Sequence, residues 1–216
     1  MNRTSRLTSH SALERQAQAG IAARHRYRLG VLAGLAILFL STCSPLVAQQ
    51  SSPPARERLI KVAYIHKFTR YVSWPDNSFA APDSPFVIGV LGEDPFGSAL
   101  DALQKRKVAG RPIVVRRYAK VQEIKTVHLL FVTDAAARKP ELLRRLLRQT
   151  PNVNTALIVG ETPGMAAAGA AIGFFDDPDG TIGFELNVDA LGRHGLHADA
   201  KLLSVSKVVR DGESRR

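Results

Sequence analysis

Residues 86–97 read FVIGVLGEDPFG, and they carry the strongest indication of fold class in this chain of 216 residues. The first six are wholly apolar, which is typical of a strand buried on both faces of a sheet. Residues 92–96 then form a turn into a helix, with Asp94 as its predicted N-cap and Pro95 as its first residue. The stretch therefore predicts a strand, a turn and a helix in an α/β protein.

Similar apolar runs recur on either side of this stretch. Strands are predicted at 86–91, 113–118, 128–132, 156–159, 171–175 and 181–186. Helices are predicted from residue 56 to the Trp74-Pro75 pair, after 94, and at 139–148, 188–191 and 200–209. The helix that begins at 56 carries one apolar stripe, which consists of Ile60, Tyr64, Phe68 and Tyr71. Turn residues at 176–180 join the last two strands as a hairpin.

Alternation of short apolar strands with helices predicts an α/β fold, a single-domain layered sandwich. Its central sheet is expected to be largely parallel and flanked by helices, with a C-terminal β-hairpin edge. The predicted organisation is a signal peptide (1–48), a linker (49–55), one α/β domain (56–210) and a frayed tail (211–216).

Composition and charge restrict the class of protein. The chain is 45% hydrophobic and 23% charged, which is a globular composition. Its formal net charge of +11 is inflated by six arginines in the first 48 residues, and the remainder holds 24 basic and 18 acidic residues. No basic run with interleaved aromatics is present, so we expect no nucleic-acid partner. Cys43 is the only cysteine, which excludes an internal disulfide and a cysteine-based zinc site.

The N-terminal region resembles an export signal. Arg24, Arg26 and Arg28 precede residues 29–40, an uncharged apolar run whose helical length of about 18 Å is too short to cross a bilayer. A basic segment, a short apolar segment and small residues beyond it are typical of a secretory signal peptide. Cleavage after Ala48 is favoured over lipid attachment at Cys43. No second apolar span follows, so we expect a soluble periplasmic protein.

Motifs for catalysis or cofactor binding are absent. The sequence holds no nucleophile elbow, no phosphate-binding loop, no zinc-binding His-Glu-x-x-His motif and no dinucleotide fingerprint. We therefore expect no enzyme activity and no cofactor.

Two clusters of polar residues suggest sites, each with a simpler structural explanation. Glu93, Asp94 and Asp134 follow predicted strands, where carboxylates could hold Mg²⁺ or accept phosphate, but helix capping explains Asp94 and Asp134 better. His194 and His197, with Asp199 nearby, could bind Zn²⁺, but Gly192 and Gly195 favour an exposed turn instead.

Partner-binding candidates come from two features. The helix at 139–148 is basic, and Arg144, Arg145 and Arg148 are its candidate contacts for an acidic protein or anionic lipid. Trp74 and Phe96 are candidate aromatic anchors in loops. Packing beneath the loop at the end of the first helix is the competing interpretation for both.

Residues 59–205 resemble the YfiR-like family of periplasmic proteins. The resemblance rests on seven segments in order, although no single one is diagnostic. They are KVAY with Phe68, Tyr71 and Trp74-Pro75; residues 88–97 (IGVLGEDPFG); 128–132 (HLLFV); 157–161 (LIVGE); 169–174 (GAAIGF); 184–187 (FELN); and 201–203 (KLL). The residue types at Ala170-Ala171 and Asp199-Ala200 differ from those usual in the family. The chain also lacks the cysteines that some members carry.

The resemblance implies a non-enzymatic regulator. The best understood members bind the periplasmic sensor domain of an inner-membrane diguanylate cyclase and repress its cyclic di-GMP synthesis, which controls biofilm formation. A membrane histidine kinase is the other candidate partner. The sequence does not decide whether the protein forms a homodimer. The alternative function is a periplasmic receptor for a small ligand, bound in a crevice near residues 92–96 and 160–164.

Overall fold

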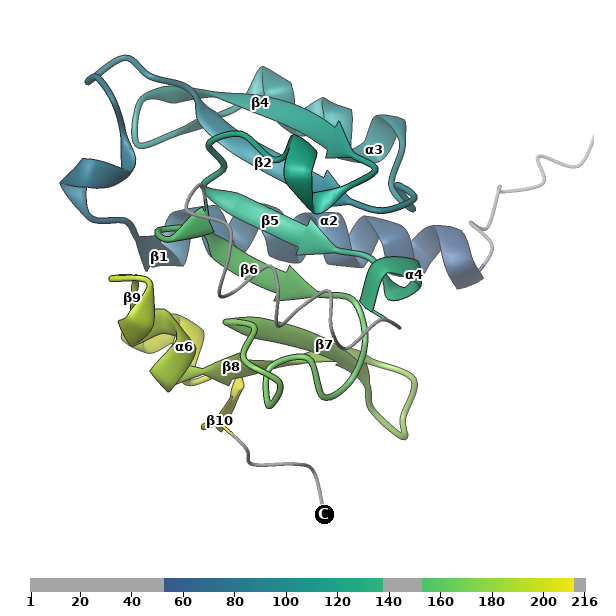
Figure 1. The fold of residues 1–216 in the computed structure, drawn as a ribbon. Helices are drawn as coiled ribbons and strands as arrows, with labels where there is room; N and C mark the ends of the chain where they lie inside the picture. Colours follow the sequence, from purple (N-terminus) through teal and green to yellow (C-terminus); the bar gives the residue numbers. More distant parts are fainter. Residues whose placement is uncertain (1–52, 138–152, 212–216) are drawn as a thin grey trace, which may run out of the picture. The chain divides into compact units, whose positions relative to one another are not determined.

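The computed structural model describes residues 53–137 and 153–211, which belong to one compact unit of the chain (Figure 1). The predicted signal peptide, residues 49–52 of the predicted linker, the basic helix at 139–148 and residues 212–216 lie outside the described residues. Within the described part, no helix has the length and apolar character needed to cross a membrane.

A mixed sheet of eight strands organises the described residues (Figure 1). Its spatial order is β10-β8-β7-β6-β5-β2-β4-β3. The strands are β2 (Phe86–Leu91), β3 (Lys107–Val108), β4 (Arg111–Tyr118), β5 (Leu129–Val132), β6 (Leu157–Gly160), β7 (Ile172–Asp176), β8 (Ile182–Asn187) and β10 (Lys207–Val209). The five neighbours β4, β2, β5, β6 and β7 run parallel, whereas β3 pairs antiparallel with β4 and β8 pairs antiparallel with β7.

The sheet is apolar on both faces, which explains the unbroken apolar runs in the sequence. Leu129 and Phe131 of β5 pack in one core cluster, while Leu130 and Val132 pack in another on the opposite face. All six residues of β2 are buried, as the apolar run at 86–91 predicts.

One long helix, α2 (Pro53–Tyr71), covers the first face and passes behind the sheet in the view of Figure 1. It begins at Pro53, so the last three residues of the predicted linker are helical; proline is compatible with a first helical turn. The buried hydrophobic residues of α2 are Val62, Ile65 and Phe68, and Val72 directly after the helix is also buried. The buried face of α2 is rotated relative to the predicted apolar stripe, of which only Phe68 is fully buried. Tyr64 and Tyr71 lie at the border of the buried face, and they are partly buried against the core.

The C-terminal end of the fold differs from the prediction. The hairpin of β7 and β8 is present, but it is not the edge of the sheet, because β10 pairs parallel with β8 beyond it. The predicted helix at 200–209 is wrong in its second half: α7 (Ala200–Leu203) stops after one turn. Val208 and Val209 are β-branched and favour a strand, and the free edge of β8 supplies the pairing.

Short elements complete the fold. They are β1 (Val72–Ser73), η1 (Asp76–Ser78), α3 (Ser98–Asp101), η2 (Ala102–Lys105), η3 (Val121–Glu123), α4 (Asp134–Ala137), α6 (Val188–Arg193) and β9 (His197–Ala198). β1 and β9 pair as a separate two-stranded sheet, which ties the end of α2 to the segment before α7.

Candidate functional site

Asp94 stabilises the turn after β2. Its Oδ1 accepts a hydrogen bond from the backbone N–H of Phe96 at 2.7 Å, and its Oδ2 pairs with Nε of Arg117 at 2.7 Å. The prediction that Asp94 caps the following helix is wrong, because α3 begins only at Ser98 and Gly97 occupies the N-cap position. Asp94 is therefore engaged in structural contacts.

The carboxylate at the end of β6 was missed by the sequence interpretation. Glu161 Oε2 accepts a hydrogen bond from the backbone N–H of Asp134 at 2.7 Å, and its Oε1 lies 3.6 Å from Nζ of the buried Lys61. Asp134 is the first residue of α4. Glu161 directly follows an apolar strand, and Asp134 follows one after a single intervening residue. The pattern that indicates Asp134, a carboxylate after an apolar strand, therefore also indicates Glu161.

These carboxylates do not form a metal centre. Among the described residues, no three His, Cys, Asp or Glu side chains are placed to hold a metal ion. The predicted ligand crevice at this end is also occupied: Phe96 is 5% exposed and packs edge to face on Phe131 at 4.7 Å. The side chain of Met165 covers Gly160 so closely that a Cβ there would overlap it.

The histidine pair is divided between core and surface. His194 is buried and its Nδ1 lies 3.1 Å from the carbonyl oxygen of Val153, so the expected exposed turn is wrong for this residue. His197 is exposed in β9, as expected. Asp199 caps α7 by accepting a hydrogen bond from the N–H of Lys201 at 2.8 Å.

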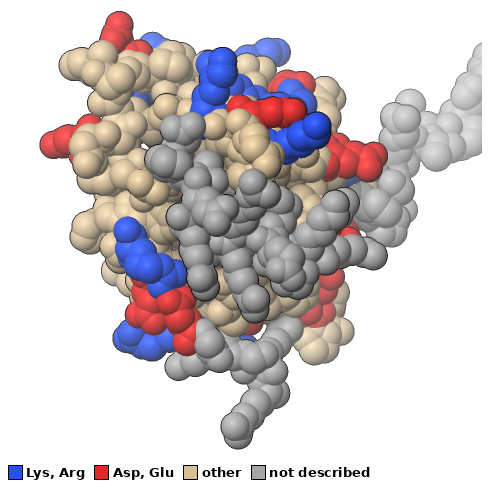
Figure 2. All heavy atoms as spheres, viewed as in Figure 1, with Lys and Arg blue, Asp and Glu red and all other residues tan. Residues whose placement is uncertain are grey.

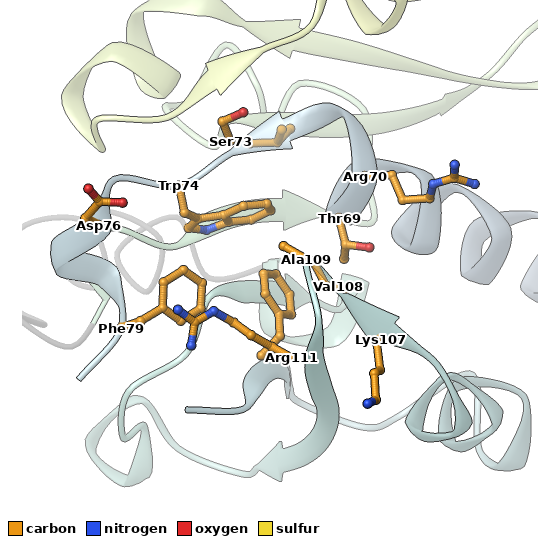
Figure 3. Close-up of a pocket in the computed structure, with 12 residues that line it drawn as sticks. Thr69, Arg70, Ser73, Trp74, Asp76, Phe79, Lys107, Val108, Ala109 and Arg111 are labelled. Atoms are coloured by element: carbon orange, nitrogen blue, oxygen red, sulfur yellow. The ribbon is translucent and has the colours of Figure 1, made fainter. Parts of the chain in front are cut away.

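A cavity of about 610 Å³ opens at the opposite end of the sheet, where β2 and β4 begin (Figure 3). Its wall combines the end of α2, β1, the loop through η1 and the β3–β4 hairpin. The lining residues are Thr69, Arg70, Val72, Ser73, Trp74, Asp76, Phe79, Phe86, Lys107, Val108, Ala109 and Arg111. Its size is within the range of small-molecule sites.

Aromatic rings build the floor of the cavity. Trp74 stands edge to face on the fully buried Phe86, with ring centroids 4.8 Å apart, and its Nε1–H donates to the carbonyl oxygen of His128 at 2.9 Å. Phe79 stacks on the His128 ring at 4.4 Å, and the Arg111 guanidinium covers the Phe79 ring at 3.8 Å. Arg111, Phe79 and His128 thus form one continuous stack.

His128 is fixed as a neutral ring by its two hydrogen bonds. The backbone N–H of Val87 donates to Nδ1 at 2.9 Å, so Nδ1 carries a lone pair. The proton is therefore on Nε2, which donates to the carbonyl oxygen of Ser78 at 3.0 Å. Burial lowers the pKa of His128; the Ser78 carbonyl partly opposes this, and the charge of Arg111 lowers the pKa further. With both ring nitrogens engaged, His128 supports the cavity wall and has no free atom for proton transfer.

The candidate interface residues fall into three groups. Trp74 is partly exposed and lines the cavity. Phe96 belongs to the core, so it is a packing residue and not an exposed anchor for a partner. Arg144, Arg145 and Arg148 lie outside the described residues.

On the face shown in Figure 2, basic and acidic side chains lie beside one another over the uncovered surface. Arg117 pairs with Asp94 and Asp101, Arg193 with Asp211, and Arg210 with Asp189. These arginines are therefore neutralised locally and form no extended basic surface.

We expect the protein to lose stability as the pH falls from 7 to 5. Burial is the main cause that lowers the pKa of both His128 and His194 below the ordinary value near 6.5. Below about pH 6.5 the unfolded chain therefore binds more protons than the folded one, and the free energy of unfolding drops by up to about 1.4 kcal/mol per pH unit for each histidine. Urea titrations at pH 7, 6 and 5 measure this slope.

A variant of one buried histidine tests this assignment. His194→Gln should reduce the slope between pH 7 and 5, because it removes one of the two buried rings. A pH-independent free energy of unfolding over this range would contradict the assignment of His128 and His194 as buried neutral rings.

A comparison with models of protein families finds a match to this chain. The model of the YfiR/HmsC-like family matches residues 58–207, more than two thirds of the chain. The matched part begins in α2 and ends at the first residue of β10, so it includes the other seven strands of the sheet and all the residues that line the cavity. A search of curated proteins found no relative.

Proposed function

This chain belongs to the YfiR/HmsC-like family, and we propose that it binds and represses the periplasmic sensor domain of an inner-membrane diguanylate cyclase. Members of the family are periplasmic regulators of signalling, and the family is regulatory and not catalytic. The match over residues 58–207 is the observation that carries the proposal.

The contacts of the polar residues support a protein that acts without chemistry of its own. Asp94 is paired with Arg117, and Glu161 is paired with Lys61. Both ring nitrogens of His128 are hydrogen-bonded to backbone groups. Asp94, Glu161 and His128 therefore each have a structural role, and the proposed function needs neither a cofactor nor a metal.

Repression by binding is a shift of population between two conformations of the sensor domain. A regulator that binds the inactive conformation about 10⁴-fold more tightly than the active one moves the equilibrium from 1:99 to 99:1. The effect depends on occupancy, so it should follow the periplasmic concentration of the regulator.

We expect deletion of the gene to raise cyclic di-GMP and biofilm mass, and an exported copy to restore both. The matched control is a copy without residues 1–48, which keeps the predicted domain but lacks the predicted signal peptide. That copy should fail to restore repression, because the proposed contact lies in the periplasm. Unchanged cyclic di-GMP after deletion, or full restoration by the copy without residues 1–48, would contradict the proposal.

The cavity favours a second candidate function, a periplasmic ligand receptor that acts through a membrane histidine kinase. Its volume of about 610 Å³ and its mixed aromatic and charged lining suit a small molecule. Crosslinking of the exported protein in intact cells separates the two candidates, because the captured membrane protein is a cyclase in the first and a kinase in the second.

A further inference from the structure

We propose that the cavity at the start of β2 and β4 binds a small organic anion, with the acidic group against Arg111 and the apolar part against Trp74. This goes beyond the proposed repression, which requires a protein partner and no small molecule. The inference rests on the charge of the lining, the geometry of Arg111 and the apolar surface beside it.

The lining has an excess of positive charge. The lining contains three cations and one carboxylate, which are Arg70, Lys107, Arg111 and Asp76. Other arginines of the described part, such as Arg117, Arg193 and Arg210, pair with carboxylates. Within the described residues, none of the three lining cations has such a partner, so their charge is available to an anion.

The positive field also reaches the neighbouring helix surface. The pKa of His66 in α2 is lowered first by burial and then by the charges of Arg106 and Arg70. Two cations near the cavity therefore already oppose a further positive charge, and the same field attracts a negative one.

Arg111 is held in place before any ligand arrives. Its Nη1 donates to the carbonyl oxygens of Ala81 at 2.8 Å and Ser84 at 3.0 Å, and its guanidinium plane covers Phe79. Its Nε and Nη2 make no hydrogen bond to any described residue. A guanidinium with a fixed plane and free N–H groups is suited to a carboxylate or phosphate, because little conformational entropy is lost on binding.

The cavity places an apolar surface beside this cation. Figure 3 shows Trp74 on one side and Phe79 with Arg111 on the other, while Arg70 and Lys107 extend outward. Trp74 is partly exposed, and the fully buried Phe86 supports it from below. The arrangement favours a ligand with an acidic end and an apolar body over inorganic phosphate alone.

A strained residue lies in the cavity wall. Ala109 has φ of 48° and is the only non-glycine residue with positive φ in the described part. It occupies the two-residue turn between β3 and β4 with Gly110, where asparagine is the usual choice. Backbone strain of this kind is concentrated at ligand-binding sites, and alanine adds only a methyl group to the cavity lining.

The sequence supplies its own reporter for the test, because Trp74 is the only tryptophan in the chain. Tryptophan fluorescence of the mature protein recovered from the periplasm is titrated with phenyl phosphate and 3-phenylpropionate, and with the neutral 3-phenylpropan-1-ol. We expect saturable binding of at least one of the two anions, and binding of the alcohol about tenfold weaker or more. No saturable response to either anion, or equal affinity for the alcohol, would overturn the proposal.

Variants test which cations act. Arg111→Lys keeps the charge but loses the planar fork, and should weaken anion binding about tenfold. Arg70→Gln with Lys107→Gln removes two exposed charges and should weaken it about threefold. The matched control, Arg58→Gln with Arg116→Gln, removes the same charge from residues that do not line the cavity, and should change the dissociation constant less than twofold.

Two results of the variant series would overturn the proposal. One is an equal loss of affinity in the matched control, since binding would then reflect net charge alone. The other combines two observations: the unmodified protein binds neither anion, and the Arg70→Gln, Lys107→Gln variant no longer captures the partner. The cavity would then be a contact surface for the partner protein. Repression measured in cells is independent of both readouts, so failure of the anion site leaves the proposed function intact.

Discussion

Trp74→Ala is expected to lower the free energy of unfolding by about 3 kcal/mol. Truncation of buried aromatic residues costs about 3–5 kcal/mol, and a partly exposed side chain belongs at the lower end of this range. The substitution removes the edge-to-face contact with Phe86 and the hydrogen bond to the His128 carbonyl. Urea denaturation of the purified protein, followed by circular dichroism, measures the change.

Trp74→Phe separates the two contributions. Phenylalanine keeps an aromatic ring near Phe86 but cannot donate a hydrogen bond, so we expect a loss of about 1 kcal/mol plus a small packing term. The His128 carbonyl also accepts a hydrogen bond from the N–H of Leu157 at 2.8 Å, so its oxygen stays satisfied in either variant. An unchanged unfolding midpoint in Trp74→Ala together with lost repression would instead identify Trp74 as a partner contact.

The strands could be predicted from the sequence because they are buried on both faces. The apolar runs at 86–91, 128–132 and 156–159 correspond to β2, β5 and β6 within one residue at each end. In such strands every side chain needs an apolar environment, so the local composition is sufficient to locate them.

The errors arise where long-range contacts decide the local structure. Residues 200–209 have a composition that suits a helix, but β8 offers an unpaired edge that only the folded sheet reveals. Asp94 stands at a good N-cap position, yet the helix begins only at Ser98, and Oδ2 of Asp94 pairs with Arg117 of β4 instead. Both outcomes depend on residues about 20 positions away in the sequence.

The cavity could not be predicted as a site. Trp74 was singled out as a candidate, but Arg111 carries no motif and reaches Phe79 only because β4 lies beside β2. His128 begins a predicted strand, and its stacking on Phe79 depends on a loop with no regular pattern. The pattern of strands and turns predicts a ligand at the carboxyl ends of the strands, whereas the cavity lies at their amino ends.

Gly92→Ala is expected to lower the free energy of unfolding by about 2–5 kcal/mol, through two effects at the end of β2. Gly92 has φ of 104°, and an L-residue in the left-handed region costs about 1–2 kcal/mol. A Cβ at this position would also overlap Oγ1 of Thr133, a buried residue that is 2% exposed, which adds about 1–3 kcal/mol.

Gly180→Ala, in the turn between β7 and β8, is the matched control, because it places the same side chain at a positive φ without the overlap. Gly180 has φ of 78°, and a Cβ there would meet nothing within 4 Å, so only the backbone term of about 1–2 kcal/mol applies. The difference between the two variants in urea denaturation therefore isolates the contact with Thr133. Equal losses would mean that the packing at the carboxyl end of β2 is loose enough to admit a side chain. The carboxyl ends of the strands would then again be a candidate ligand site, in addition to the cavity at Trp74.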